Sequence, residues 1–230
     1  MQKLRAVLFA TSLVIACQGA SAQLVAPAPL RPDQIMSGLT AETMTVLRQD
    51  PGAKRSADLA QLIDKRIAPV FDFERMTRIA VARNWRLASP EQQLALAGQF
   101  KILLVRTYSK ALLDFREHAI EYKPLRAAAG DTEVTVRSAM RRSGVEPLTI
   151  DYDMADGRAG WQVYDVKIAG VSLVLAYRES FENIVRTSGV DGLIKTLEDK
   201  NRQNAAAVGI DASKLAPVLM IYGASRADNP

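Results

Sequence analysis

Residues capable of acid–base or metal chemistry are scarce in this chain. One histidine, His118, serves all 230 residues, and it follows Glu117 directly. A catalytic histidine needs a nucleophile within hydrogen-bond reach, and no serine stands in the strand-to-helix context of a nucleophile elbow. A zinc site needs three or four Cys, His or carboxylate ligands, and a chain with one histidine is poorly equipped for it. We therefore predict that His118 is a surface residue near the end of a helix, without a catalytic role.

The acidic stretch over residues 151–156 is the second candidate for chemistry. Asp151, Asp153 and Asp156 resemble the start of a calcium-binding loop. Asp151 and Asp153 would alternate along a strand, however, and no bidentate glutamate follows at the spacing that such a loop requires. No glycine-rich phosphate loop is found either. The sequence favours a solvated strand face followed by a turn, with no metal, no cofactor and no enzymatic activity.

Apolar surface, by contrast, is concentrated over residues 160–192. The pattern predicts two short strands, Gly160–Ile168 and residues 171–177, which meet at Ala169-Gly170. Both are apolar on both faces, and strands of this kind are covered by other elements on both sides. Because residues suited to acid–base or metal chemistry are so few, we interpret this apolar surface as the part of the protein that carries its function. It indicates that the protein holds something hydrophobic.

The remaining pattern predicts helices before the sheet and after it. Ser89 and Gln92 form a capping box around Pro90, which opens the longest helix. The predicted helices span residues 33–49 (with Asp33 as N-cap), 56–68, 72–83, 90–117, 179–187 and 191–204, and the strands before the hairpin span residues 119–125, 132–141 and 146–154. Short links between strands imply an antiparallel meander, so the fold class is α+β. A curved sheet covered by a long helix leaves an interior that side chains need not fill.

The first 22 residues have the pattern of an export signal. Lys3 and Arg5 precede an apolar run that is too short to span a bilayer, and Ala20-Ser21-Ala22 resembles a cleavage site. A lipobox that ends at Cys17 is the alternative, which would make that cysteine an acylated N-terminus.

The rest of the chain is predicted to be one domain with flexible ends. Residues 23–32 are expected to be a leader, residues 33–204 the domain, and residues 205–230 a C-terminal tail. The net charge of +5 comes from scattered basic residues without interleaved aromatic residues, so nucleic acid is not an expected partner.

Energetics set the size of the space that a lipid would need. Extraction of a lipid with two tails exposes about 30 methylene groups at roughly 0.8 kcal/mol each, or about 20–25 kcal/mol in total. Both tails would have to be enclosed, in a cavity near or above the upper end of the usual ~300–1,000 Å³ range. The plain alternative for each single apolar residue is that it belongs to the core of the domain.

A set of motifs runs through the domain in a fixed order. The motifs are Pro69-Val70, Ser89-Pro90-Glu91-Gln92, Gly160-Trp161-Gln162-Val163-Tyr164-Asp165-Val166, Gly170-Val171-Ser172, Arg186-Thr187 and Gly189-Val190-Asp191-Gly192-Leu193. Together, after an export signal, they resemble the MlaC family, also called the toluene-tolerance Ttg2-type auxiliary component of ABC transporters. The similarity covers about residues 33–204 and leaves the tail outside.

The resemblance implies a periplasmic carrier of glycerophospholipids that helps to maintain the lipid asymmetry of the outer membrane. The carrier would shuttle between an outer-membrane lipoprotein–porin complex and an inner-membrane ABC transporter that bears a ring of MCE-domain proteins. The implied fold is a twisted antiparallel sheet wrapped by helices around an apolar lipid cavity. The acyl chains would lie inside and the headgroup outside, so that glycerophospholipid is cargo and no cofactor is expected.

The matched segments supply the candidate lipid-binding residues. These are Val70, Phe73, Met76, Ile79, Phe100, Leu104, Tyr108, Trp161, Val163, Tyr164, Val166, Ile168, Val171, Leu173, Leu175 and Tyr177. Strand alternation places Trp161 and Val163 on one face. It places Tyr164, Val166 and Ile168 on the other, and either face could contact lipid.

Two other classes of function stay open. The protein could be a periplasmic adaptor that binds an apolar protein segment in a groove. It could also be a small hydrolase or isomerase on a similar curved-sheet scaffold, in which case replacement of His118 should abolish activity.

Overall fold

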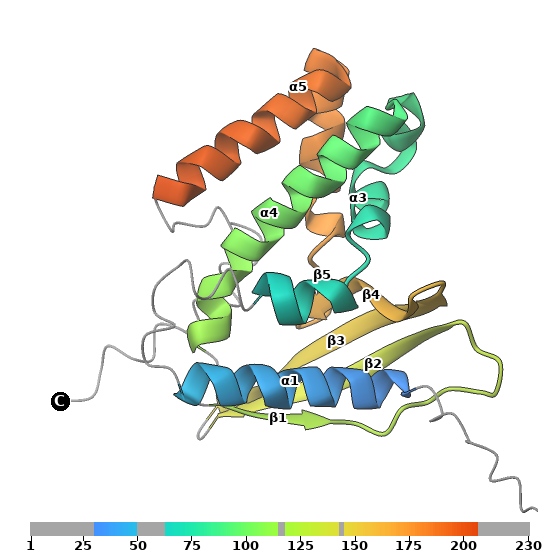
Figure 1. Cartoon of the computed structure of the whole chain (residues 1–230), viewed down its shortest axis with the longest axis vertical. Coiled ribbons are helices and arrows are strands. Elements are labelled where there is room, and N and C mark those ends of the chain that lie inside the picture. The colour runs from blue at the N-terminus through green and yellow to red at the C-terminus, as the bar shows by residue number, and fades with distance from the viewer. Residues whose placement is uncertain (1–29, 50–62, 115–117, 143–144, 207–230) are drawn as a thin grey trace, which may run out of the picture.

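A five-stranded antiparallel sheet and a layer of helices make up the α+β fold (Figure 1). The computed structural model describes residues 30–49, 63–114, 118–142 and 145–206. The strands are β1 (Ala119–Tyr122), β2 (Glu133–Arg142), β3 (Val145–Gly157), β4 (Gly160–Ile168) and β5 (Val171–Ser172). The helices are α1 (Pro32–Gln49), α3 (Phe73–Val81), α4 (Pro90–Asp114) and α5 (Arg178–Ala206), and shorter helical turns cover Ile63–Ile67, Ala68–Val70, Ala82–Leu87 and Leu175–Tyr177. Each strand pairs with the next in the chain, which confirms the predicted meander.

Local sequence signals explain where helices begin. The Ser89 N–H donates to Oε1 of Gln92 at 2.9 Å and the Gln92 N–H donates to Ser89 Oγ at 3.2 Å, so the predicted capping box is formed. Asp72 caps α3 by accepting the Arg75 N–H at 2.9 Å. At α1 the predicted cap is wrong, because the helix already begins at Pro32 and Asp33 lies in its first turn.

The C-terminal helix changes direction at Gly189. Its backbone there has φ 70° and ψ −175°, a conformation that is not helical and that glycine alone adopts readily. The two predicted helices are therefore the two halves of α5, on either side of this residue. None of the helices within the described ranges is long and apolar enough to cross a membrane.

The second strand of the predicted hairpin is much shorter than expected. β5 contains only Val171–Ser172, and Leu175–Tyr177 forms a 3₁₀ turn that leads directly into α5. Ser172 Oγ accepts the Leu175 N–H at 3.0 Å. A side chain of this kind offers the backbone a local alternative to the strand ladder, and a pattern of apolar residues does not register it.

A β-bulge interrupts the pairing of β3 with β4. Asp153 pairs with Asp165, but the next pair is Met154 with Val163, so Tyr164 is the extra residue. An extra residue in one strand of an antiparallel pair disturbs the strict alternation of its side chains.

The bulge places the apolar side chains of β4 on a single face. Val163, Val166 and Ile168 belong to the same buried cluster, and Trp161 packs against it. Tyr164 faces the opposite side, where it lines a polar depression with charged residues of β2 and β3. The prediction that Val163 and Val166 face opposite ways is therefore wrong, and β4 is apolar on one face only.

Asp153 lies on the polar face of the sheet, but it is buried. The prediction that this residue is solvated is therefore wrong. Its carboxylate accepts the Thr135 hydroxyl at 2.8 Å and lies 2.7 Å from Lys167 Nζ. A buried carboxylate without such partners would be costly, so the lysine and threonine explain its position.

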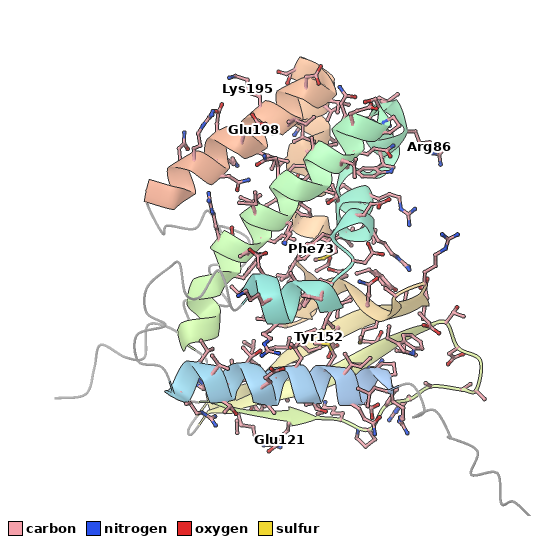
Figure 2. All side chains as sticks on the ribbon, in the orientation of Figure 1. Phe73, Arg86, Glu121, Tyr152, Lys195 and Glu198 are labelled. Carbon is pink, nitrogen blue, oxygen red and sulfur yellow. The ribbon has the colours of Figure 1, made fainter. Side chains whose placement is uncertain are left out.

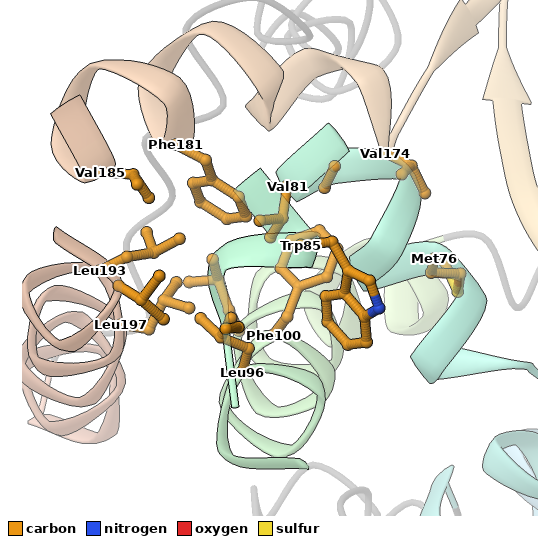
Figure 3. Close-up of a cluster of buried hydrophobic side chains, with 14 of the residues drawn as sticks. Met76, Val81, Trp85, Leu96, Phe100, Val174, Phe181, Val185, Leu193 and Leu197 are labelled. Carbon is orange, nitrogen blue, oxygen red and sulfur yellow. The ribbon is translucent and has the colours of Figure 1, made fainter. Parts of the chain in front are cut away.

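Two large buried hydrophobic clusters fill most of the fold, one among the helices and one on the sheet, and a smaller third cluster comprises Met44, Leu47 and Ile63. The helical cluster comprises Met76, Ala80, Val81, Trp85, Ala88, Leu96, Phe100, Leu103, Leu104, Val174, Phe181, Val185, Val190, Leu193 and Leu197 (Figure 3). The sheet cluster comprises Met36, Val134, Val136, Met140, Leu148, Ile150, Met154, Val163, Val166, Ile168 and Leu173. Met36 belongs to α1, which lies against the same face of the sheet (Figure 1).

The segment before α3 connects the helices to the sheet through hydrogen bonds. Phe71 forms an isolated parallel bridge with Val163, and the Asp72 N–H donates to the Val163 carbonyl at 2.9 Å. Gln162 Nε2 donates to the Pro69 carbonyl at 3.2 Å. These bonds satisfy part of the edge of β4 that the short β5 leaves open.

Candidate functional site

The two hydrophobic clusters meet at Phe71 and Tyr108, whose side chains pack against both. We call this boundary the seam and define it by Val70, Phe71, Phe73, Tyr108 and Tyr177. The rings of Phe71 and Phe73 are stacked, with centroids 5.9 Å apart and planes inclined by 22°. The seam therefore presents a continuous apolar and aromatic surface between the helices and the sheet.

Every seam residue retains accessible surface. Residues next to the seam do not: Met76 is 2% exposed and Phe100 is 0% exposed. Phe100 is enclosed by edge-to-face contacts with Tyr177 at 5.1 Å and Phe181 at 5.3 Å between centroids. The helical cluster is thus a closed core, and open apolar surface is found at its boundary with the sheet.

On the sheet side, Tyr152 keeps accessible surface at the middle of the sheet. It lies on β3, the central strand, between its cross-strand partners Val136 and Val166. Those partners are 1% and 8% exposed, yet Tyr152 is only half-buried. Figure 2 labels its position. A side chain flanked in this way stays accessible only where the space above it is not filled. Tyr152 therefore keeps part of its surface accessible on the apolar face of the sheet.

The hydroxyls of Tyr108 and Tyr152 are uncharged at physiological pH. Burial raises the pKa of Tyr108, and the neighbouring Tyr177 hydroxyl raises it further. Burial also raises the pKa of Tyr152, with Tyr122 as the next contribution. The Tyr122 hydroxyl lies 2.5 Å from Thr40 Oγ1, which ties β1 to α1. An interior lined by neutral groups suits hydrocarbon better than ions.

Two depressions on the surface of the described residues are polar. One, of about 410 Å³, lies between α4 and α5. The other, of about 430 Å³, lies on the outer face of the sheet and is lined by charged residues that include Arg126, Arg137 and Lys167. Neither is an enclosed apolar chamber. The cavity predicted from the sequence therefore stays a prediction, which the accessible seam and Tyr152 support.

The structure sorts the predicted lipid-binding residues into three groups. Met76, Phe100, Leu104, Val163, Val166, Ile168 and Leu173 are buried in the two clusters. Val70, Phe73, Ile79, Tyr108, Trp161 and Tyr177 are half-buried and pack against the clusters. Tyr164 lies on the polar face of the sheet, and Val171 and Leu175 are 37% and 45% exposed. Only the half-buried group combines apolar character with accessible interior surface.

Two residues of this site, Phe71 and Tyr152, are not among those predicted from the sequence. Tyr152 alternates with Ile150 and Met154 along a strand, so the period-2 pattern could have identified it as facing the core. Phe71 carries no such signal, because its place depends on a bridge to Val163, far away in the sequence.

His118 and the acidic residues were the polar candidates for chemistry. His118 is half-buried, and therefore less exposed than predicted, and it stands immediately before β1. No group of three or more His, Cys, Asp or Glu residues in the described ranges could hold a metal ion.

Comparison with known proteins finds a similar solved structure and similar sequences. A solved structure, the phospholipid-binding protein from Ralstonia solanacearum in complex with a phospholipid, is similar with a TM-score of 0.71 and 37% identity, over 76% of this chain and 99% of that one. The toluene tolerance protein ttg2D of Pseudomonas putida is 25% identical over 179 residues, 76% of this chain and 82% of the relative. The intermembrane phospholipid transport system binding protein MlaC of Haemophilus influenzae is 21% identical over 174 residues, 74% of this chain and 78% of the relative.

The match to a family model is extensive. The model of the MlaC protein family matches residues 38–199, which include most of α1, the whole sheet and the bend of α5 at Gly189. The overall structural similarity and the sequence matches agree with this assignment. The chain belongs to the MlaC family.

Proposed function

We propose that this protein is a periplasmic phospholipid carrier that encloses acyl chains between the helical and sheet clusters. The single observation that carries the proposal is the accessible position of Tyr152 in the middle of an otherwise buried sheet face. Support comes from the seam, which is apolar and half-buried, and from the similar Ralstonia protein, which was solved with a phospholipid.

The physical basis is the burial of hydrocarbon. Transfer of the two acyl chains of a phospholipid from a membrane to water costs about 20–25 kcal/mol of free energy. A carrier must therefore offer enough apolar surface to offset this cost. Seam residues and Tyr152 supply part of such a surface, without an ionised group. The headgroup would remain at the mouth of the space, where water solvates it at little cost.

The carrier would exchange lipid between an outer-membrane lipoprotein–porin complex and an inner-membrane ABC transporter with MCE-domain subunits. Support for this part comes from the relative in Haemophilus influenzae, which is named as the binding protein of an intermembrane phospholipid transport system. Membership of the same family extends that role to this chain as a proposal. Passive exchange of this kind needs no enzymatic activity and no cofactor.

The test is the lipid content of the purified protein. We expect native mass spectrometry of protein isolated from a Gram-negative host to show a mass increase of one phospholipid. Val70→Glu places a charge on the seam and should reduce the bound fraction at least about tenfold, because an ionised carboxylate is costly in an apolar space. The matched control is Leu94→Glu on α4, where the side chain is 73% exposed and the substitution should change nothing.

Two results would count against the carrier. A bare polypeptide mass in every gentle preparation would favour the adaptor for an apolar protein segment. Equal lipid content in the Val70→Glu and Leu94→Glu proteins would remove the seam from the binding site.

A further inference from the structure

A depression of about 430 Å³ lies on the outer face of the sheet, opposite the face that carries the apolar cluster. Its charged lining consists of three cations, Arg126, Arg137 and Lys167, and two carboxylates, Glu133 and Asp153. Arg126 belongs to the loop after β1, and the other four side chains come from β2, β3 and β4. The pairing of these charges shows what the depression could bind.

Both carboxylates of the depression already have a cation. Asp153 lies 2.7 Å from Lys167 Nζ and also accepts the Thr135 hydroxyl at 2.8 Å. Glu133 Oε1 lies 2.7 Å from Nη2 of Arg75, a residue of α3. The positive charges of the two remaining arginines are therefore not balanced by the carboxylates of the lining.

Arg126 and Arg137 hold these two unbalanced charges. Both side chains are exposed, and neither forms an ion pair or a side-chain hydrogen bond with any residue that the structure describes. Asp151 is the cross-strand partner of Arg137, but it does not line the depression and forms no ion pair with it. The Lys123 N–H donates to the Arg137 carbonyl at 2.9 Å, so the chain that leads to Arg126 runs beside β2. The depression thus brings two unpaired guanidinium groups together.

The number of donors and the charge indicate the ligand. Each guanidinium is a planar fork that binds two oxygen atoms at once. A carboxylate has two oxygens and one charge, which a single arginine satisfies. A phosphomonoester has three terminal oxygens and a charge of about −1.5 to −2 at pH 7, which matches two arginines.

We infer that this depression binds a phosphomonoester group. The forks of Arg126 and Arg137 bind its terminal oxygens, and the Lys167 ammonium, which has three donors, supplies those that Asp153 does not accept. A group of this kind has two sources, a phosphomonoester headgroup at a membrane surface and a soluble phosphomonoester. The seam lies against the other face of the sheet, so the inference does not rest on the carrier proposal.

The test is an NMR titration of the full chain, labelled to show arginine side-chain N–H groups, with glycerol 3-phosphate at constant ionic strength. The Nε–H signals of Arg126 and Arg137 should shift saturably in both lipid-loaded and lipid-free protein. Dimethyl phosphate has one charge and two free oxygens, and acetate has the same number of each. Both should therefore need at least about tenfold higher concentration, because they satisfy fewer charge-assisted hydrogen bonds.

A pair of arginine substitutions tests the site against general surface charge. Arg137→Gln should weaken binding of glycerol 3-phosphate at least about tenfold, because a bidentate, charge-assisted contact is lost. Arg86→Gln is the matched control, since Arg86 is also exposed but lies on the Ala82–Leu87 turn among the helices (Figure 2). That variant should bind as the wild type does.

Sedimentation with vesicles distinguishes the two sources. The vesicles contain phosphatidylcholine with either phosphatidic acid, a phosphomonoester, or phosphatidylglycerol, a phosphodiester. Preference for phosphatidic acid that Arg137→Gln abolishes and Arg86→Gln retains would assign the membrane source. Saturable binding of glycerol 3-phosphate without that preference would assign the soluble source.

Three results would overturn the inference. A titration without saturation would show that the arginines are merely solvated, and equal weakening by both substitutions would show only general attraction of anions. Acetate that binds as tightly as glycerol 3-phosphate would favour an acidic protein segment instead. Since none of these readouts involves the seam, loss of the carrier proposal would leave them unchanged.

Discussion

The guanidinium carbon of Arg75 lies 3.7 Å from the centroid of the Tyr164 ring. Arg75 Nη2 also lies 2.7 Å from Glu133 Oε1, and the Tyr164 hydroxyl donates to Glu133 Oε2 at 3.1 Å. One residue of α3 is therefore bound to two strands on the polar face of the sheet. This contact reinforces the attachment of α3 that Phe71 and Asp72 make at the edge of β4.

Arg75→Ala should lower the free energy of unfolding by about 1 kcal/mol, since it removes a cation–π contact and a partly exposed ion pair. A double-mutant cycle with Tyr164→Leu, followed by urea denaturation, should give a coupling of about 0.5–1 kcal/mol. Lipid content should be unchanged, because Tyr164 faces away from the seam. Additive effects would show that the stacked geometry contributes nothing.

Asp165 should make stability depend on pH in an unusual direction. Burial raises the pKa of this carboxyl above 3.8, even though Ser172 and the Val174 and Val166 N–H groups oppose the shift by hydrogen bonding. In the window between 3.8 and the raised pKa, the folded state binds more protons than the unfolded state, so stability rises as pH falls. The free energy of unfolding of the wild type minus that of Asp165→Asn should therefore increase as the pH falls through the raised pKa toward 3.8.

Glu133 provides the matched control with the opposite sign. Hydrogen bonding from Arg75 lowers its pKa below 4.5, so its contribution is present above that value and is lost as pH falls through the folded pKa. The same difference measured for Glu133→Gln should shrink toward low pH. Parallel slopes for the two variants would contradict both assignments.

Gly189→Ala should destabilise the fold by about 1–3 kcal/mol, because φ 70° with ψ −175° is a region that L-residues avoid. Gly98→Ala tests the same change inside α4, where an added Cβ would meet nothing within 4 Å. That substitution should stabilise the protein by about 0.5–1 kcal/mol through helix propensity. Thermal unfolding of both variants checks the signs, and a loss at both positions would contradict the assigned role of the bend.

Substitutions of Phe100 and Phe73 should distinguish a core residue from a residue that contacts lipid. Phe100→Ala should cost about 3–5 kcal/mol of stability, because its ring is fully buried among Tyr177 and Phe181. Phe73→Ala should cost less and should reduce the bound lipid instead, because that ring is half-buried in the seam. Denaturation and lipid extraction of the two proteins distinguish the roles. Equal stability losses would show that Phe73 is core as well.

Features governed by neighbouring residues could be predicted from the sequence. The capping box of Ser89 and Gln92, the bend at Gly189 and the antiparallel order of the strands all arise from short-range chemistry or short links. The order and spacing of the motifs likewise identify the family from the sequence alone.

The site itself depended on contacts between distant segments. The bulge at Tyr164 changes which side chains of β4 face the core. The hydrogen bond from the Leu175 N–H to Ser172 Oγ accompanies the end of β5 after two residues. Phe71 then pairs with part of the edge of β4 that the short β5 leaves open. No period in the sequence encodes an extra residue in one strand relative to its partner. The sequence by itself determined which elements form and that they carry apolar surface. Only the tertiary structure decided which of that surface is closed core and which stays accessible at the seam, because accessibility depends on how two clusters from different parts of the chain meet.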